Sequence, residues 1–237
     1  DFAFSGSETL NVTGSDGINT YNREAFNNSA IGRLPFVNGV KCINGMVFDI
    51  DTECDDVIFP DEDEDLHAIA NHIPFWKVKQ ITVHRGSTVR LLCRCNMLLK
   101  TVNICGSFGE SVCQTKEEMA SRLTIDSIVE LCCLEGVENI NIFDDSKTYK
   151  SIDGIVYSCD GKRLLKCPRG KIGHVTIPEG TEVIAASAFK HCHIDSVSFP
   201  STLIKLENDA FVSSTVKKID FGTGIKAVGW FSFCREL

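Results

Sequence analysis

The sequence predicts a solenoid of the α/β class, in which short parallel strands stack coil upon coil with irregular or short helical segments between them. Two observations predict it. The C-terminal third repeats with a period of 22 residues, so that Ala188-Phe189 is matched by Ala210-Phe211 and Phe199 by Phe221. A shorter pattern, apolar-x-x-apolar-x-apolar, recurs along the rest of the chain. Repeats of this length are typical of folds in which each unit buries its apolar face against the next.

The shorter pattern marks seven expected strands. Its last three residues alternate apolar, polar, apolar, as a strand with one buried face requires. Successive motifs start 47, 21, 38, 35, 22 and 22 residues apart, so we expect insertions where the spacing exceeds 22. The motifs are Ile31-Leu34-Phe36, Val78-Ile81-Val83, Leu99-Val102-Ile104, Val137-Ile140-Ile142, Ile172-Val175-Ile177, Ile194-Val197-Phe199 and Val216-Ile219-Phe221.

We expect one solenoid domain over residues 1–237, because the motifs run through nearly the whole chain. An N-terminal lead covers residues 1–30, and degenerate repeats with insertions cover residues 31–143. Regular 22-residue repeats cover residues 152–237.

Two echoes connect the halves of the chain. Residues 22–31 have the form of residues 208–216, and residues 44–60 resemble residues 153–168. The last of these segments predicts a β-hairpin, because Asp160-Gly161 supplies a turn between two apolar runs.

A helix is expected in the insertion that precedes Val137. Thr115 and Glu118 form a capping box, and Met119, Leu123 and Ile128 follow at approximately helical spacing. The acidic run at residues 61–65 does not follow the ligand spacing of an EF-hand, so we expect a solvated loop there.

Composition excludes several classes of function. Hydrophobic residues make up 43% and charged residues 24%, which is typical of a folded globular protein. A net charge of −8 without a Lys/Arg cluster argues against a nucleic-acid partner. Apolar runs fall far short of the roughly 20 residues that span a bilayer, so no membrane insertion is expected. Without a phosphate loop or a dinucleotide fingerprint, no cofactor is expected.

Twelve cysteines allow disulfides, metal ligands or small buried hydrophobic residues. Structural zinc usually needs two CxxC-like knuckles, and the cysteines between Cys93 and Cys133 lack that spacing, so no metal site is expected. Disulfides within the group from Cys93 to Cys113 stay open.

The tripeptide His191-Cys192-His193 places a thiol beside imidazoles, as in some nucleophilic sites. The repeat explains it better, because the next unit carries Ser213-Ser214-Thr215 at the same positions. We therefore expect no catalytic residue and no enzymatic activity.

The run IPEGTEVIAASAFKHC, with DGIVYSCDGKRLLKCPRGK ahead of it, resembles the BspA-like leucine-rich repeats of bacterial surface proteins. Ile184, Ala188-Phe189 and Cys192 fall on the family's positions, whereas Ser214 replaces the cysteine in the next unit. The resemblance is specific over residues 152–233. It implies a right-handed superhelix with a parallel sheet on its concave side, a buried Cys192, an extracellular or cell-surface location and a role in adhesion or recognition.

Placing the strands in register puts their intervening residues on the concave sheet, where repeat proteins present a continuous surface to partners. We expect a non-enzymatic binding or adhesion module for a protein or glycan ligand; the alternative is a spacer or stalk of a larger surface protein. The predicted contact residues are Gln80, Thr82, Thr101, Asn103, Asn139, Asn141, His174, Thr176, Ser196, Ser198, Lys218 and Asp220.

The last coil stops at Leu237 with its apolar edge uncapped. We expect that the solenoid continues in a longer parent protein, or that this end pairs with another chain in end-to-end self-association. The chain shows no signal-peptide pattern, so a signal either does not exist or was removed.

Overall fold

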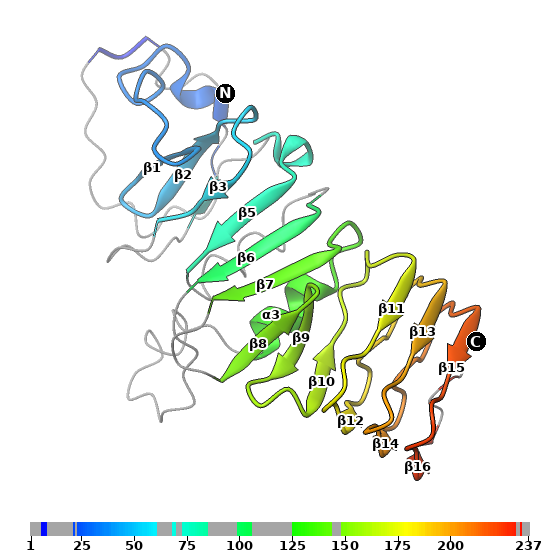
Figure 1. Cartoon of the computed structure of the whole chain (residues 1–237). Helices are drawn as coiled ribbons and strands as arrows, with labels where there is room; N and C mark the ends of the chain where they lie inside the picture. The colour runs from blue at the N-terminus through cyan, green and yellow to red at the C-terminus, as the bar shows by residue number, and fades with distance from the viewer. Residues whose placement is uncertain are drawn as a thin grey trace.

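The chain forms a β-solenoid in which the elements run in sequence order from β1 and β2 at one end to β15 and β16 at the other (Figure 1). This computed structural model describes residues 6–8, 21, 23–60, 68–69, 73–84, 99–105, 125–143, 148–230 and 233. The expected capping box at Thr115 and the acidic run at residues 61–65 lie outside these ranges.

The described elements of the first half are η2 (Arg23–Phe26), β1 (Val40–Ile43), β2 (Met46–Ile50), β3 (Val57–Ile58), β4 (Ala68–Ile69), η3 (Phe75–Lys77), β5 (Gln80–Val83), β6 (Thr101–Cys105), α3 (Ile125–Cys132) and β7 (Asn139–Phe143). Those of the second half are β8 (Tyr149–Ile152), β9 (Ile155–Ser158), β10 (Arg163–Lys166), β11 (His174–Thr176), β12 (Val183–Ile184), β13 (Ser196–Ser198), β14 (Lys205–Leu206), β15 (Lys218–Asp220) and β16 (Ala227–Val228).

In the second half, paired residues of neighbouring parallel strands are 22 positions apart in the sequence, which is the predicted period. His174 of β11 pairs with Ser196 of β13, and Ser196 pairs with Lys218 of β15, all in parallel. The short strands β12, β14 and β16 form a second parallel ladder with the same step. The strand motifs from Val78 onward are therefore confirmed, and with them the solenoid.

The repeated Ala-Phe pair builds the core of the second half. Phe189 and Phe211 are fully buried and stack with ring centroids 4.5 Å apart and an interplanar angle of 4°. Phe233 continues the stack at 5.2 Å from Phe211. Each fully buried ring stabilises the fold by roughly 1.5–3 kcal/mol through the hydrophobic effect, and stacking adds to it.

In two units, the serine three residues after the buried phenylalanine closes a turn by a hydrogen bond. Ser214 Oγ donates to the carbonyl oxygen of Phe211 at 2.7 Å, and Ser29 Oγ donates to that of Phe26 at 2.5 Å. This shared bond confirms the echo between residues 22–31 and 208–216. In the unit directly before Phe211, Cys192 occupies the position three residues after Phe189 and is a fully buried thiol, as the resemblance implied.

Two β-hairpins have two-residue turns whose residues both adopt a positive φ. Asn44-Gly45 has φ of 47° and 72° and joins β1 to β2, and Asp153-Gly154 has φ of 50° and 71° and joins β8 to β9. These values suit the two-residue turns of β-hairpins. The expected hairpin around Asp160-Gly161 is also present, as the antiparallel pair β9 and β10.

The first expected strand, Ile31-Leu34-Phe36, is wrong. Ile31 is buried, but the backbone turns there, and Leu34 N donates to the Ile31 carbonyl oxygen at 3.1 Å. The strand that begins this ladder is β3, which pairs with β5. Phe59 N then donates to Thr82 O at 3.0 Å, just as Ile177 N donates to Ser198 O in the regular coils.

The expectation of one continuous concave sheet is also wrong. The expected strands form two separate sheets, β3-β5-β6-β7 and β11-β13-β15. The β8–β9 hairpin occupies the outer edge of β7, where Ile140 N donates to Gly154 O and Ile142 N donates to Ser151 Oγ, both at 3.0 Å. An edge that is already hydrogen-bonded cannot accept β11 as its next strand.

The same hairpin marks the boundary between two hydrophobic cores. Val156 of β9 belongs to the core under β5, β6 and β7, whereas its neighbours Ile155 and Tyr157 belong to the core of the second half. Ile128 of α3 packs into the first core, which confirms the C-terminal part of the expected helix. A third cluster around Phe26 and Phe48 lies near the N-terminus. One domain over residues 1–237 stays a prediction.

Candidate functional site

The second sheet presents the predicted contact residues to solvent. We call His174, Thr176, Ser196, Ser198, Lys218 and Asp220 the β11 face. His174 and Thr176 of β11 and Lys218 and Asp220 of β15 are exposed, and the two serines of β13 between them are half-buried. Their buried neighbours Val175 and Val197 point into the core. Side chains from three parallel strands therefore form two short exposed rows.

Hydrogen bonds within the β11 face join neighbouring coils. His174 Nδ1 shares a hydrogen bond of 2.7 Å with Ser196 Oγ, and His174 Nε2 lies 3.5 Å from Ser198 Oγ. At the next coil boundary, three residues ahead of β13 and β15, His193 Nδ1 and Thr215 Oγ1 are 2.8 Å apart. These contacts engage both ring nitrogens of His174, whereas each hydroxyl has one donor and two acceptor sites and so keeps capacity for a ligand.

The first sheet is different, because its polar side chains bond to one another. We call Asp56, Thr82, Asn103 and Asn141 the Asp56 row. Asp56 Oδ2 accepts from Thr82 Oγ1 at 2.8 Å and from Asn103 Nδ2 at 3.2 Å. Asn141 Nδ2 donates to Asn103 Oδ1 at 3.0 Å.

The Asp56 row is also poorly accessible. Thr82 is 6% exposed, and among the described residues none is a hydrogen-bond partner of the buried Oδ1 of Asp56. Three of the predicted contact residues, Thr82, Asn103 and Asn141, thus use hydrogen-bonding groups to contact a neighbouring coil. Asp56 was not predicted as a site residue. It directly precedes Val57, the first residue of β3, and its acidic side chain at that position is the only signal in the sequence.

Asn139, another predicted contact residue, holds the hairpin in place. Its Oδ1 accepts from Lys171 Nζ at 3.2 Å, and the same ammonium donates to Asp153 O at 2.6 Å. Gln80 and Thr101 are half-buried members of the same sheet. The sheet therefore keeps only part of its polar surface for a partner.

Three cysteines are core residues, with Cys192 of the His-Cys-His tripeptide among them, whereas Cys93, Cys95 and Cys113 lie outside the described residues. Cys132, Cys167 and Cys192 are fully buried, and burial raises the pKa of the Cys132 and Cys167 thiols well above the usual range. A protonated, inaccessible thiol is neither a nucleophile nor a metal ligand. Within the described ranges, no three His, Cys, Asp or Glu side chains are grouped so that they could hold a metal ion.

Trp76 and Phe36 line an open pocket near the N-terminus; the strand pattern counted Phe36 as a strand residue and did not mark Trp76. Trp76 is 51% exposed and Phe36 is 40% exposed. They share the pocket with Arg23, Asp49 and Asp51, among others. The strand pattern missed the pocket because η2, β2 and η3, which lie far apart in sequence, each supply part of its wall.

No helix in the described part of the chain is long and apolar enough to cross a membrane.

Comparison with known proteins points to one repeat family. A model of the BspA type leucine-rich repeat region matches residues 1–84 and 166–237, with six copies. No curated protein matches the chain.

Three solved structures are similar to it. A leucine-rich repeat protein from Eubacterium ventriosum is 13% identical, with a TM-score of 0.39, and the match covers 76% of this chain and 57% of that protein. A leucine-rich cell surface protein from Faecalibacterium prausnitzii is 18% identical, with a TM-score of 0.36 and coverage of 72% and 42%. The pneumococcal vaccine antigen PcpA is 12% identical, with a TM-score of 0.32 and coverage of 87% and 67%. The chain thus spans about half the length of the first two proteins.

Proposed function

The chain belongs to the BspA-type leucine-rich repeat family, and from this premise we propose that it is a non-enzymatic binding module. In this proposal the β11 face contacts a protein or glycan partner, and the remaining coils form the scaffold that positions it. A secreted or cell-surface location is part of the proposal, with the family as its support.

The observation that carries the proposal is the contrast between the two sheets. In the Asp56 row, the polar groups of neighbouring coils satisfy one another, and Thr82 is buried. On the β11 face, strands in the same parallel arrangement leave His174, Thr176, Lys218 and Asp220 exposed. Binding needs accessible groups, so the β11 face is favoured over the first sheet.

The chemistry of this face fits a polar contact that gains strength by repetition. It offers hydroxyls, an imidazole, an ammonium and a carboxylate, and it has no large aromatic side chain to act as an energetic anchor. A single contact of this kind is weak, but several copies or several modules bound at once raise the overall affinity.

A binding screen tests the proposal. The chain would be passed over immobilised matrix proteins and glycans, and the affinity for any captured partner would be compared with that of Thr176→Glu. The added charge lies on the exposed surface of β11, within the β11 face, so we expect at least a tenfold loss of affinity, which corresponds to about 1.4 kcal/mol. Thr101→Glu, on the half-buried surface of β6, is the matched control and should bind as the unchanged protein does. Equal binding by all three proteins would overturn the assignment of the face.

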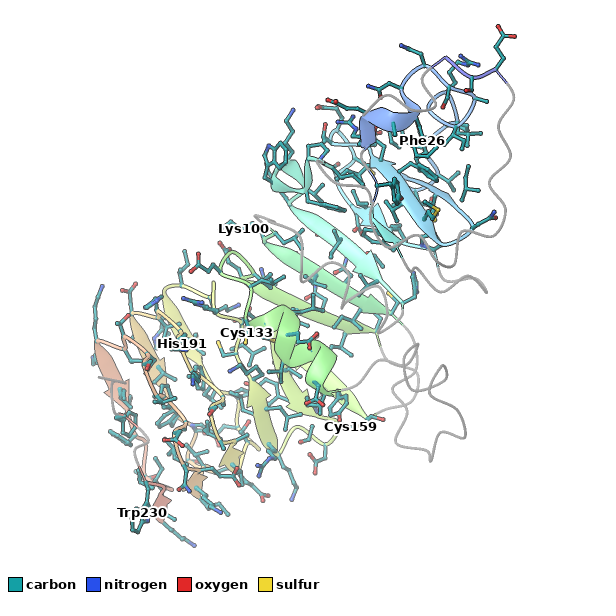
Figure 2. The ribbon with its side chains drawn as sticks, turned by 180° about the vertical axis from the view of Figure 1, so that it is seen from behind. Phe26, Lys100, Cys133, Cys159, His191 and Trp230 are labelled. Atoms are coloured by element: carbon teal, nitrogen blue, oxygen red, sulfur yellow. The ribbon has the colours of Figure 1, made fainter. Side chains whose placement is uncertain are left out.

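End-to-end self-association is proposed as a second interaction. The last coil exposes Phe221, Val228 and Trp230, at 42%, 51% and 78% of their areas. Figure 2 shows Trp230 at this end of the solenoid. Sedimentation of the unchanged protein and of Trp230→Glu tests it, since only the unchanged protein should form dimers. A monomer in both cases contradicts it.

A further inference from the structure

The pocket beside η3 has the composition of a small-molecule site, and we propose that it binds a neutral saccharide. We call it the Trp76 pocket; its walls include Arg23, Phe36, Asp49, Asp51, Thr52 and Trp76. It is built from loops and strand ends of the first half, so the inference is independent of the β11 face.

Trp76 is held outward by a rigid turn. Phe75 before it and Val78 after it are each 2% exposed and anchor the turn in the core. Lys77 N donates to Pro74 O at 3.0 Å, and Val78 N donates to Phe75 O at 3.1 Å. The indole therefore presents a large, pre-positioned apolar surface to solvent, which costs free energy unless a ligand covers it.

Phe36 forms a second aromatic wall, and Lys41 fixes it. The Lys41 ammonium lies 4.7 Å from the ring centroid, in a cation–π contact, and donates to Gly32 O at 2.6 Å. Lys41 itself is 8% exposed, and burial lowers the pKa of its ammonium. One face of the Phe36 ring thus contacts the Lys41 ammonium, and the residue as a whole is 40% exposed.

The polar groups between these walls are oriented before any ligand arrives. Arg23 Nη2 donates to Asp49 Oδ2 at 2.8 Å, and Asp49 Oδ1 accepts from Ile50 N at 2.9 Å. Asp51 Oδ1 accepts from Glu53 N at 3.0 Å. A guanidinium has five N–H donors and a carboxylate has about four acceptor sites, so these bonds fix the groups and leave capacity for a ligand.

The charges of the pocket select a neutral ligand. Arg23 and Lys77 contribute two positive charges and Asp49 and Asp51 two negative ones, so a phosphate or an ammonium ligand would meet as much repulsion as attraction. Hydroxyl groups both donate and accept, and they match such a mixed set of partners. A pyranose ring adds an apolar C–H face that can lie on the indole of Trp76. Among common small ligands, a neutral saccharide combines both features.

The size of the pocket agrees with this class. Its volume is about 390 Å³, near the lower end of the roughly 300–1,000 Å³ typical of ligand pockets. It is open to solvent along one side, which suits the end or an internal unit of a longer glycan. Ile50, which is 2% exposed, closes the floor with apolar surface.

Fluorescence titration tests the proposal directly, because Trp76 and Trp230 are the only tryptophans in the chain. In Trp230→Phe, the emission reports on Trp76 alone. Titration with cellobiose, maltose and N,N′-diacetylchitobiose should give a saturable change in emission for at least one of them. Calorimetry of the unchanged protein should give the same dissociation constant.

Matched variants separate the site from its surroundings. Trp76→Ala should weaken saccharide binding about tenfold or more, whereas Trp230→Ala, which removes the more exposed tryptophan at the far end, should not change it. Asp51→Asn should weaken binding, and Asp55→Asn, outside the pocket, should not. Circular dichroism checks that each variant is folded, and Trp76→Phe, which keeps an aromatic wall, should bind more tightly than Trp76→Ala.

Three outcomes would overturn the proposal. They are the absence of saturable binding by any saccharide in folded Trp230→Phe, tighter binding of glucose 6-phosphate or glucosamine than of glucose, and binding of adenosine or free tryptophan in place of saccharides. Thr176→Glu should leave saccharide binding unchanged, so a failure of the β11 face and a failure of this pocket are distinguishable.

Discussion

The amide of Ile140 donates a hydrogen bond of 3.0 Å to the carbonyl oxygen of Gly154, and this contact divides the parallel ladder of the solenoid. It places the turn of the β8–β9 hairpin against the edge of β7, where the next coil would otherwise pair. The first sheet therefore ends at β7, and β11 starts a new one. The two sheets then differ in how they use their polar residues.

Replacing Gly154 should damage this junction. A Cβ at Gly154 would lie 2.4 Å from Asn139 Oδ1 and 2.9 Å from Asn139 Cα, at a φ of +71°. Both the overlap and the positive φ are unfavourable, so we expect Gly154→Ala to lose about 2–4 kcal/mol in urea unfolding. Gly173→Ala is the control, because Gly173 has a φ of +79° and nothing within 4 Å of its Cβ position. Equal losses in the two variants would show that the close approach contributes nothing.

Asp56 should matter for stability far more than its neighbour Asp55. Asp56→Ala removes the acceptor shared by Thr82 and Asn103, and the buried Thr82 hydroxyl loses the group to which it donates, which costs about 1–3 kcal/mol. Asp55 is exposed, and Asp55→Ala removes the same charge at a cost within about 0.5 kcal/mol. Urea midpoints of the two variants check this, and a similar shift in both would contradict the role of the Asp56 row.

Glu207 should make the second half of the solenoid more stable at neutral than at acidic pH. Arg163 donates to the Glu207 carboxylate through Nη1 and Nη2, at 2.9 and 2.5 Å, and these bonds hold the pKa of the carboxyl below its ordinary value. A folded pKa below the unfolded one, about 4.3 for Glu, gives stability that is present above that value and is lost as the pH falls through the folded pKa. We expect Glu207→Gln to be about 1 kcal/mol less stable at pH 7 because the pair is partly exposed.

The difference between Glu207→Gln and the unchanged protein should shrink toward zero as the pH falls below 4. Arg163→Lys keeps the positive charge but loses the bidentate contact, so at pH 7 its stability should lie between that of Glu207→Gln and that of the unchanged protein. A constant difference from pH 7 to pH 3 would contradict the assignment.

Thiol modification should separate surface from core cysteines. Cys133 and Cys159, both labelled in Figure 2, are exposed, whereas Cys132, Cys167 and Cys192 are fully buried. Burial raises the pKa of Cys132 and Cys167, so they stay protonated and inaccessible at pH 8. Peptide mapping after iodoacetamide treatment should find the first two modified in the native protein and the other three only after unfolding. Early modification of Cys192 would contradict its place in the core.

The strands were predictable wherever a polar residue separates two buried ones. Val102 and Ile104 flank Asn103 and are fully buried, which is the alternation that the pattern detected. The same three-point pattern failed at Ile31-Leu34-Phe36, because Ile31 is buried by a turn and the other two side chains are exposed. The pair Phe59-Pro60, which repeats Ile177-Pro178 and Phe199-Pro200, was the better signal for the first coil.

The candidate sites were less predictable, because they depend on contacts between distant residues. The pattern places Thr82 and Asn103 on one face, but it does not show that Asp56 bonds to both. Likewise, Arg23 and Asp49 meet across 26 residues to form one side of the Trp76 pocket. Periodicity reports the direction of a side chain, and such bonds depend on how the loops between coils pack.

Partner affinity measured in two matched triple variants distinguishes the roles of the two sheets. Thr82→Ala/Asn103→Ala/Asn141→Ala disrupts the Asp56 row, and His174→Ala/Thr176→Ala/Ser198→Ala removes polar groups from the β11 face. For a partner captured in the binding screen, we expect the first variant to keep its affinity while its urea midpoint falls, and the second to keep its midpoint while its affinity falls. Loss of affinity in the first variant, with full binding by the second, would contradict the account.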